Sequence, residues 1–455
     1  MYRHHLKAIQ GWFEHQHHKP LVLRGARQVG KSTLVRLFAE QQAIELVALN
    51  FERNPEYAEL FHTKDPKSIV ANIRLMMNKN LIPEQSLLFL DEIQAAPKVL
   101  ACLRYFYEEI PSLHVIAAGS LLDFELAAPE FSMPVGRISY MHIYPMNFTE
   151  FLYAVGEKTL AEYLEQWHIG DEIIAPVHDK LMGLLRQNMA VGGMPEAVKT
   201  FRDSSDYRHC EVMKQDLMAT FQDDFAKYAR QQDQDLIRLS FRQAPSFIGR
   251  KVKYSEISRD IASPRVAKAL EQLHMARVVH KVVRTSANGL PLAAEENTKF
   301  FKLLFLDVGL VSTMMHVSWQ VLQQDLMLVN QGALAEQWVG QELLNSLDAH
   351  QPPHLHYWAR ESRSSSAEVD YVIAGAHPVP IEVKAGKTGS LKSLHLFIQE
   401  KSTPLAIRLN ADMPSLMLLD QQKGRVQKTE HECCRLLSLP LYMAGQIRRL
   451  IASPL

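Results

Sequence analysis

Cysteine is scarce in this chain, and long apolar runs are missing. The 455 residues include four cysteines, which show neither a metal-ligand spacing nor the density of a disulfide-stabilised protein. No apolar run reaches the roughly 18 residues of a membrane-spanning helix. The first residues, from Met1 to His5, lack the apolar stretch of a secretory signal. Together these absences predict a cytoplasmic protein with reduced thiols and no membrane segment.

Net charge is missing as well, because 50 Lys and Arg residues balance 50 Asp and Glu residues. A neutral chain is a poor candidate for indiscriminate binding to nucleic acid. Apolar residues make up 47% of the sequence, a content that excludes disorder along most of its length. At about 100–200 residues per domain, the chain is long enough for about two to four domains with a core of their own.

The patterning of apolar residues predicts four parts along the chain. In residues 1–150, short apolar runs alternate with helical patterns, which predicts buried parallel strands in a doubly wound α/β layer. Residues 151–232 have the pattern of a helical lid or linker. Residues 233–313 combine short helices with β-branched runs, and residues 314–455 combine a helix with two strand-like pieces.

A glycine-rich motif, GARQVGKS at residues 25–32, matches the pattern G-x-x-x-x-G-K-[ST] between an apolar strand and an amphipathic helix. The two glycines let backbone N–H groups point inward at phosphates. Lys31 can then reach the β- and γ-phosphates, while Ser32 supplies a hydroxyl to Mg²⁺. The motif therefore predicts ATP and Mg²⁺ as cofactors. The expected phosphate cradle comprises Gly25, Ala26, Arg27, Gln28, Val29, Gly30, Lys31, Ser32 and Thr33.

Two carboxylates follow the apolar run Leu87 to Leu90. This is a Walker B pattern, in which Asp91 holds Mg²⁺ through its water shell and Glu92 polarises the attacking water. The alternative is an acidic pair that only ends a strand, and the glycine-rich loop upstream favours the Walker B interpretation. We therefore expect Asp91 to be a metal residue and Glu92 to be catalytic, together with Lys31.

Two more polar residues lie where predicted strands end. Ser120 follows the strand-like run before Gly119 and can sense the γ-phosphate. Arg137 can stabilise transition-state charge as a finger, either in its own chain or in a neighbouring subunit. For each residue, a structural or surface role is an equally good alternative.

In their order, these motifs resemble a group of prokaryotic AAA-type ATPases whose C-terminal part is a domain of unknown function with a restriction-endonuclease-like fold. The residues that carry the resemblance are GARQVGKS at 25–32, LDEIQ at 90–94, AGS at 118–120, GR at 136–137, YPMNF at 144–148, GGMPEA at 192–197, FKLLFLDVGL at 301–310, EVK at 382–384 and LPLY at 439–442. The resemblance spans nearly the whole chain. It implies ATP binding and suggests a winged-helix module in residues 233–313, but it supplies no cellular role.

A basic segment interrupts the neutral chain. Residues 238–284 contain eleven Lys or Arg residues and three acids, a net charge of +8. The order of helices and strand-like pieces in this segment is typical of a helix-turn-helix followed by a β wing. Such an arrangement can place Arg265 and Lys268 against DNA phosphates or bases. The alternatives to DNA contact are a solvated basic face or a protein-binding module.

A second constellation lies near the C-terminus, where Asp370 precedes Glu382-x-Lys384 on two adjacent strand-like pieces. The two carboxylates can share a hard cation, Lys384 can position a water, and Glu336 on the preceding helix can join them. The arrangement resembles the PD-(D/E)XK nuclease core. Because this short pattern also arises by chance, the alternative is a nuclease-like fold without metal binding or catalysis.

The twenty histidines match no metal-ligand spacing, so we expect them at the surface. The sequence as a whole predicts an AAA-type P-loop ATPase with a helical lid, a winged-helix module and a PD-(D/E)XK-like α/β domain. In one hypothesis, ATP controls contact with DNA or a protein partner and gates a nuclease. In the other, the chain is a nucleotide-dependent switch or binding module whose C-terminal fold is inert. Neither fixes the oligomeric state, although Arg137 acting in trans requires an oligomer.

Overall fold

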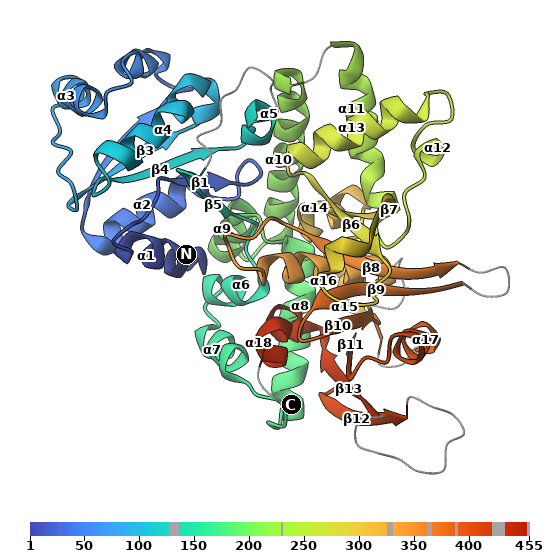
Figure 1. Ribbon diagram of the computed structural model, residues 1–455. Coiled ribbons are helices and arrows are strands. Elements are labelled where there is room, and N and C mark those ends of the chain that lie inside the picture. The colour runs from blue at the N-terminus through green and yellow to red at the C-terminus, as the bar shows by residue number, and fades with distance from the viewer. Residues whose placement is uncertain are drawn as a thin grey trace.

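The computed structural model describes residues 1–126, 136–228, 231–324, 331–361, 366–386, 390–420 and 433–452. An N-terminal α/β unit, a group of helices and a second, larger sheet lie side by side (Figure 1). Within those residues, no helix is both long enough and apolar enough to cross a lipid bilayer.

The N-terminal sheet is parallel throughout, with strand order β2-β3-β4-β1-β5. Its strands are β1 (Leu21–Arg24), β2 (Glu45–Asn50), β3 (Ser86–Asp91), β4 (His114–Gly119) and β5 (Ser139–His142). The helices of this unit are α1 (His5–Glu14), α2 (Lys31–Gln42), α3 (Pro66–Met77), α4 (Pro97–Glu109) and α5 (Leu122–Leu126). The predicted α/β layer with a parallel sheet is thus confirmed.

Alternation along β3 explains why both faces of this sheet are covered. Leu87 and Phe89 pack into one buried cluster, while Leu88 and Leu90 pack into another. Successive side chains of a strand point to opposite faces, so an unbroken apolar run requires a layer of helices on each side. The carboxyl ends of the parallel strands then share one edge, where the predicted site residues follow.

Helices dominate the middle of the chain. They are α6 (Phe148–Ala154), α7 (Lys158–Gln166), α8 (Ala175–Val191), α9 (Pro195–Ser204) and α10 (Tyr207–Tyr228). Three more follow, α11 (Gln231–Gln243), α12 (Tyr254–Ile257) and α13 (Ser263–Met275). Asn147 begins α6 with a capping box, because its side chain accepts from Glu150 N–H while the Glu150 carboxylate accepts from Asn147 N–H.

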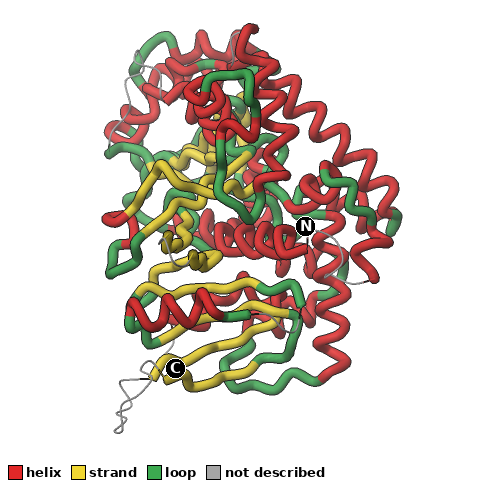
Figure 2. The backbone as a smooth tube through the Cα atoms, turned by 90° about the vertical axis from the view of Figure 1, so that its right-hand side faces the viewer, coloured by secondary structure: helices red, strands yellow, loops and turns green. Residues whose placement is uncertain are grey.

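The second sheet has eight strands in the order β12-β13-β11-β10-β9-β8-β6-β7. Its strands are β6 (Val279–Thr285), β7 (Glu296–Phe305), β8 (Leu355–Glu361), β9 (Ser366–Ala374), β10 (Pro378–Val383), β11 (Leu405–Asn410), β12 (Ser415–Asp420) and β13 (Cys433–Pro440). The accompanying helices are α14 (Val308–Met314), α15 (Trp319–Gln324), α16 (Gln331–Asn345), α17 (Lys392–Lys401) and α18 (Ile447–Ala452). The view turned by 90° shows these strands side by side with a helix lying along them (Figure 2).

This sheet crosses the domain boundary that we placed between residues 313 and 314. Strand β6 pairs with β7 on one edge and in parallel with β8 on the other, with Val282 opposite Leu355. A hairpin edge exposes unpaired N–H and C=O groups, and β8 covers that edge here. The strands predicted as a wing are therefore part of the same sheet as the C-terminal strands. The sheet continues across the boundary between residues 313 and 314.

Three of the sequence motifs meet in the interior. Gly193 N–H donates to Asp307 Oδ2 at 2.6 Å, and Met146 N–H donates to the Gly193 carbonyl at 2.7 Å. Gly192 has a φ of +83°, and a Cβ there would lie 2.1 Å from Asp307 Oδ1, so only glycine fits. Asp307 is fully buried. This junction joins the N-terminal unit, the helical middle and the second sheet.

Candidate active site

The glycine-rich loop connects β1 to α2, as the sequence predicted. Gly30 immediately precedes α2 with a φ of +93°, a conformation that disfavours other residues. A Cβ at Gly25 would lie 2.3 Å from the Ile143 carbonyl oxygen, so the loop start also requires glycine. The loop thereby points the N-terminus of α2, with its free N–H groups and positive dipole end, at the site.

Lys31 occupies the centre of this loop. Its buried Nζ donates to the carbonyls of Gly25 at 3.0 Å and Ala26 at 2.8 Å. Burial lowers the pKa of Lys31 to about 8, although Glu92 and Asp91 act in the opposite direction. The ammonium is thus held at the mouth of the loop by two carbonyls, which phosphate oxygens can replace as acceptors.

Ser32 and Asp91 come together from separate motifs. The Ser32 hydroxyl donates to Asp91 Oδ1 at 2.8 Å, and Asn50 Nδ2 donates to Asp91 Oδ2 at 3.1 Å. Asp91 is buried at the carboxyl end of β3. A hydroxyl and a carboxylate side by side are hard oxygen donors of the kind that Mg²⁺ prefers. The residues present therefore fit the predicted magnesium site.

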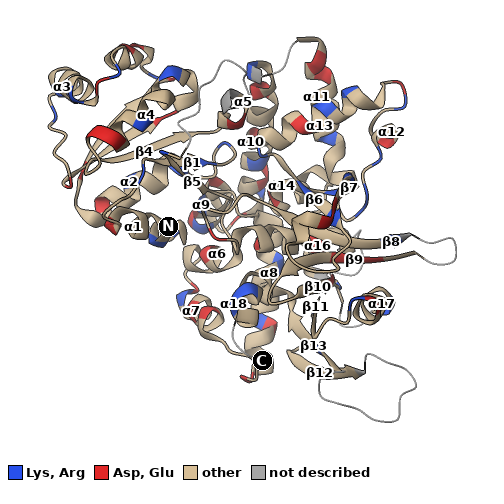
Figure 3. Cartoon of the chain, in the orientation of Figure 1, with Lys and Arg blue, Asp and Glu red and all other residues tan. Residues whose placement is uncertain are grey.

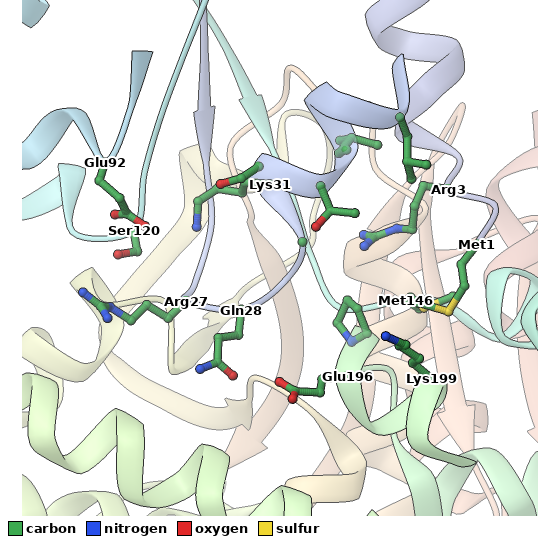
Figure 4. A pocket seen from close by; sticks show the side chains of 16 residues that line it. Met1, Arg3, Arg27, Gln28, Lys31, Glu92, Ser120, Met146, Glu196 and Lys199 are labelled. Atoms are coloured by element: carbon green, nitrogen blue, oxygen red, sulfur yellow. The ribbon is translucent and has the colours of Figure 1, made fainter. Parts of the chain in front are cut away.

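Glu92 and Ser120 line the same cavity from two neighbouring strands. Glu92 has a φ of +52°, and its carboxylate accepts a hydrogen bond from Gln94 Nε2 at 2.6 Å. Ser120 is 3% exposed, and its hydroxyl has no hydrogen-bond partner among the described residues. Figure 4 shows the two side chains near each other on the side that Lys31 faces. A buried hydroxyl without a partner is costly, which fits a group that awaits a phosphate oxygen.

The cavity around these residues has a volume of about 530 Å³, within the usual range for a small-molecule site. Its lining comprises Met1, Arg3, Arg27, Gln28, Gly30, Lys31, Ser32, Thr33, Leu34, Leu37, Glu92, Ser120, Met146, Pro195, Glu196 and Lys199. Sequence reasoning missed the wall formed by Met1, Arg3 and the α9 residues (Figure 4). The GGMPEA motif was the available signal for α9, because it contains Pro195 and Glu196.

Arg27 connects the loop to the helical middle. Its Nε lies 2.5 Å from Asp224 Oδ2 on α10, and its guanidinium lies 3.8 Å from Glu52. Lys227, also on α10, donates to Glu52 at 2.7 Å. Burial raises the pKa of Asp224, and Arg27 opposes that rise. The phosphate cradle and α10 are therefore joined by an ion-pair network.

Arg137 does not reach the cavity. Its side chain is 48% exposed and donates from Nε to Glu108 Oε1 at 2.8 Å. It is absent from the lining of the nucleotide cavity in the described part of the chain. A role toward the cavity of its own chain has no geometric support here, and a role toward a neighbouring subunit stays a prediction.

The C-terminal candidates cluster around a cation that we did not predict. Lys302 on β7 is buried, and its Nζ lies 2.8 Å from Glu336 Oε1, 2.6 Å from Glu368 Oε1 and 3.8 Å from Asp370 Oδ1. Lys384 Nζ donates to Glu382 Oε1 at 2.6 Å. Asp370 Oδ2 also accepts from the backbone N–H of residue 383 at 2.8 Å. Glu336 and Asp370 thus converge, as expected, but on an ammonium.

Electrostatics in this cluster follow from burial. Burial raises the pKa of Glu336 to about 8, and burial with the Asp370 charge raises that of Glu382 to about 7. Burial alone would lower the pKa of Lys302, but the carboxylates of Glu336, Asp370 and Glu368 together raise it well above its usual value. The Lys302 ammonium therefore offsets part of the negative charge of Glu336, Glu368 and Asp370.

Replacing Lys302 with methionine should destabilise the protein by about 3–5 kcal/mol at neutral pH, because buried carboxylates lose their cation. Protonation relieves this penalty. Since Glu336 and Glu382 have raised pKa values in the folded state, the deficit should shrink as the pH falls from about 8 toward the ordinary glutamate range. Thermal unfolding at several pH values measures this loss of stability in Lys302→Met. Lys299→Met, at an exposed position on β7, is the control. Equal losses of stability in the two variants would contradict the role of Lys302 as the cation of the cluster.

The basic segment is partly neutralised by its neighbours. Arg265 and Lys268 on α13 lie 3.3 Å and 3.2 Å from the carboxylate oxygens of Asp233 on α11. Figure 3 shows acidic and basic residues interleaved along the chain in α11, α12 and α13. A hollow of about 540 Å³ lies beside this region. Its basic lining residues are Arg250, Lys251, Lys253 and Arg360, and its acidic ones are Glu256 and Glu368.

Family models match three successive parts of the chain. Residues 17–152 match an AAA domain, and residues 182–321 match a domain of unknown function, DUF8612. Residues 331–433 match a second domain of unknown function, DUF4143. No curated protein matches the chain.

Several solved structures are distantly similar. A Walker-type ATPase of Pyrococcus abyssi is 15% identical with a TM-score of 0.42, over 68% of this chain and 94% of that one. The RuvB Holliday junction branch migration motor of Thermotoga maritima is 15% identical with a TM-score of 0.28, over 61% and 86%. AMPPCP-bound DnaA from Aquifex aeolicus is 14% identical with a TM-score of 0.27, over 59% and 86%.

The AAA-domain match covers the parallel sheet, the glycine-rich loop and the Ser32–Asp91 contact. Fold, motif order and site geometry agree over this region. The chain therefore carries an AAA-type P-loop ATPase domain in residues 17–152.

Proposed function

We propose that the chain is a Mg²⁺-dependent ATPase whose nucleotide state is transmitted through α10 to the second sheet. The observation that carries this proposal is the 2.8 Å contact between the Ser32 hydroxyl and Asp91, next to a buried Lys31. Free thiols at all four cysteines suit a reducing compartment, and we place the protein in the cytoplasm. Magnesium-dependent release of phosphate from ATP tests the catalytic part.

Each site residue has a distinct task in this scheme. Lys31 and the N–H groups at the start of α2 bind the phosphates, while Ser32 and Asp91 hold Mg²⁺. When bound, Mg²⁺ neutralises charge on the β- and γ-phosphates. Glu92 orients and polarises the attacking water, and Ser120 donates to the γ-phosphate. Arg137 has no task at the cavity of its own chain, because it lies outside that cavity and pairs with Glu108.

Two ion-pair networks support transmission of the nucleotide state. One joins Arg27 of the loop to Asp224 of α10, so a phosphate that attracts Arg27 competes with Asp224. The other is centred on Asp123, just after Ser120. Asp123 pairs with Arg24 and accepts from Arg277 Nε at 2.8 Å, and Arg277 lies between α13 and β6. Both networks connect the edge of the ATPase sheet to the rest of the chain.

The nucleotide-dependent switch is the better of the two hypotheses for the C-terminal part. Lys302 contacts Glu336 and Asp370, and Lys384 contacts Glu382, so ammonium groups already lie among the carboxylates that would bind a metal ion, and this favours an inert fold. The nuclease hypothesis has one observation in its favour. The hollow lined by Arg250, Lys251, Lys253 and Arg360 also contains Glu368, so a phosphate backbone held there would lie next to the acidic cluster.

Incubating the full chain with plasmid and single-stranded DNA should therefore produce no cleavage in Mg²⁺ or Mn²⁺, with or without ATP. Gel electrophoresis detects nicking, and a Lys384→Ala variant prepared in parallel identifies cleavage by a contaminant. Salt-dependent retention of intact DNA would support a DNA-binding switch. Cleavage that disappears in Lys384→Ala would overturn the switch hypothesis and establish the nuclease.

A further inference from the structure

Two histidines and a glutamate converge on the second sheet, away from the nucleotide cavity. His354 Nε2 and His356 Nε2 each lie 2.6 Å from the same atom, Glu296 Oε1. All three ligand atoms lie within 4.8 Å of one another. His356 is 8% exposed, contrary to our expectation of surface histidines. The cluster thus has one largely buried imidazole, one half-exposed imidazole and one carboxylate.

The strand pattern explains how these residues meet. His354 immediately precedes β8 and His356 is its second residue, so a spacing of two places both side chains on one face of the strand. Glu296 begins β7, and β6 lies between the two strands, with Thr285 opposite Glu296 and Val283 opposite His356. The three side chains therefore reach toward one another across β6. Glu296 and His356 are 60 residues apart in the chain, which hid the cluster from spacing arguments.

A hydrogen-bonded trio without a metal is the simpler alternative, in which each imidazole donates to the carboxylate. Two features favour a metal site over this alternative. Both Nε2 atoms are directed at one oxygen atom, and the shared direction leaves the ligand atoms facing a common point. The three ligand atoms also lie within 4.8 Å of one another, close enough for a single ion to contact all of them. Two imidazoles and one carboxylate form a recurring donor set for zinc.

We propose that Glu296, His354 and His356 bind one divalent transition-metal ion of the Zn²⁺ type, with water as a further ligand. The ion ties β7 to β8 across β6 and so fastens the hairpin to the C-terminal strands. Zinc bonds of about 2.0–2.2 Å require the ligand atoms to separate by less than about 1 Å, which the half-exposed His354 can accommodate. The nitrogen donors select against Mg²⁺, which belongs at the oxygen ligands Ser32 and Asp91.

Calorimetric titration of the EDTA-treated, untagged full chain with Zn²⁺, in excess Mg²⁺, tests this site. We expect one zinc ion per chain and a zinc-dependent rise in melting temperature. Glu296→Gln, His354→Ala and His356→Ala should each weaken binding by about tenfold or more. Co²⁺ in place of Zn²⁺ should give the intense visible absorption of a four- or five-coordinate nitrogen site. His17→Ala is the matched control, because it removes an exposed histidine from the N-terminal cluster.

His354→Ala guards against a folding artefact, since this side chain is 46% exposed and its metal-free variant should melt like the metal-free parent. The proposal is overturned if the parent chain binds no zinc. It is also overturned if the affinity is unchanged in His354→Ala and His356→Ala, or if it falls only in His17→Ala, since the metal would then be an adventitious ion only.

Discussion

Replacing Lys31 with alanine is expected to abolish measurable ATP binding. The Lys31 ammonium is buried and held by the carbonyls of Gly25 and Ala26, so it is already positioned where phosphates approach the loop. Charge-assisted hydrogen bonds to phosphate in a buried site are among the strongest that a side chain makes. We expect the affinity to fall at least about a hundredfold, roughly 2.7 kcal/mol.

Isothermal titration with a non-hydrolysable ATP analogue and Mg²⁺ measures this loss. Lys67→Ala, at an exposed position on α3, is the matched control and should bind like the parent chain. Circular dichroism must show that Lys31→Ala keeps the parent's helix content. Unchanged affinity in a folded Lys31→Ala protein would contradict the assignment of the phosphate site.

Replacing Glu92 with glutamine is expected to stop turnover while leaving binding intact. A glutamine keeps the size of the side chain and can still hydrogen-bond Gln94, but it cannot accept a proton from water. General-base catalysis typically contributes about 10²–10⁴-fold, so turnover should fall by that factor. The affinity for ATP should change by less than roughly twofold, because Lys31, Ser32 and Asp91 remain.

Phosphate release under single-turnover conditions, together with analogue titration, separates these two quantities. Glu109→Gln is a suitable control, because this glutamate is exposed at the end of α4. A Glu92→Gln protein that hydrolyses ATP at the parent rate would exclude Glu92 as the base. Loss of binding together with turnover would instead make Glu92 part of the phosphate cradle.

The positions of Lys31, Ser32 and Asp91 could be predicted from local sequence, whereas their roles stay predictions. Lys31 and Ser32 are fixed by a loop of eight consecutive residues, and Asp91 is fixed by the end of one apolar strand. The parallel sheet then brings the two segments to one edge, where the Ser32–Asp91 contact forms. Residues of this kind are predictable because their roles depend on backbone geometry within a few residues.

The remaining features depend on contacts between distant segments. Arg27 is part of the motif, but its partner Asp224 is on a helix that no short pattern connects to the loop. Lys302 looked like any lysine in a strand, yet burial among three carboxylates makes it the cation of its cluster. The net charge of residues 238–284 did not include Asp233, which lies just outside that segment. In the structure Asp233 pairs with Arg265.

The central claim is that Lys31, Ser32, Asp91 and Glu92 form a magnesium-dependent ATPase site. Phosphate release from ATP by the purified full chain, with and without Mg²⁺, tests it most directly when Glu92→Gln is purified and assayed in parallel. We expect saturable, magnesium-dependent release of phosphate by the parent chain and loss of this release in Glu92→Gln. Absence of release by a parent chain that binds ATP, or equal release by both proteins, would contradict it.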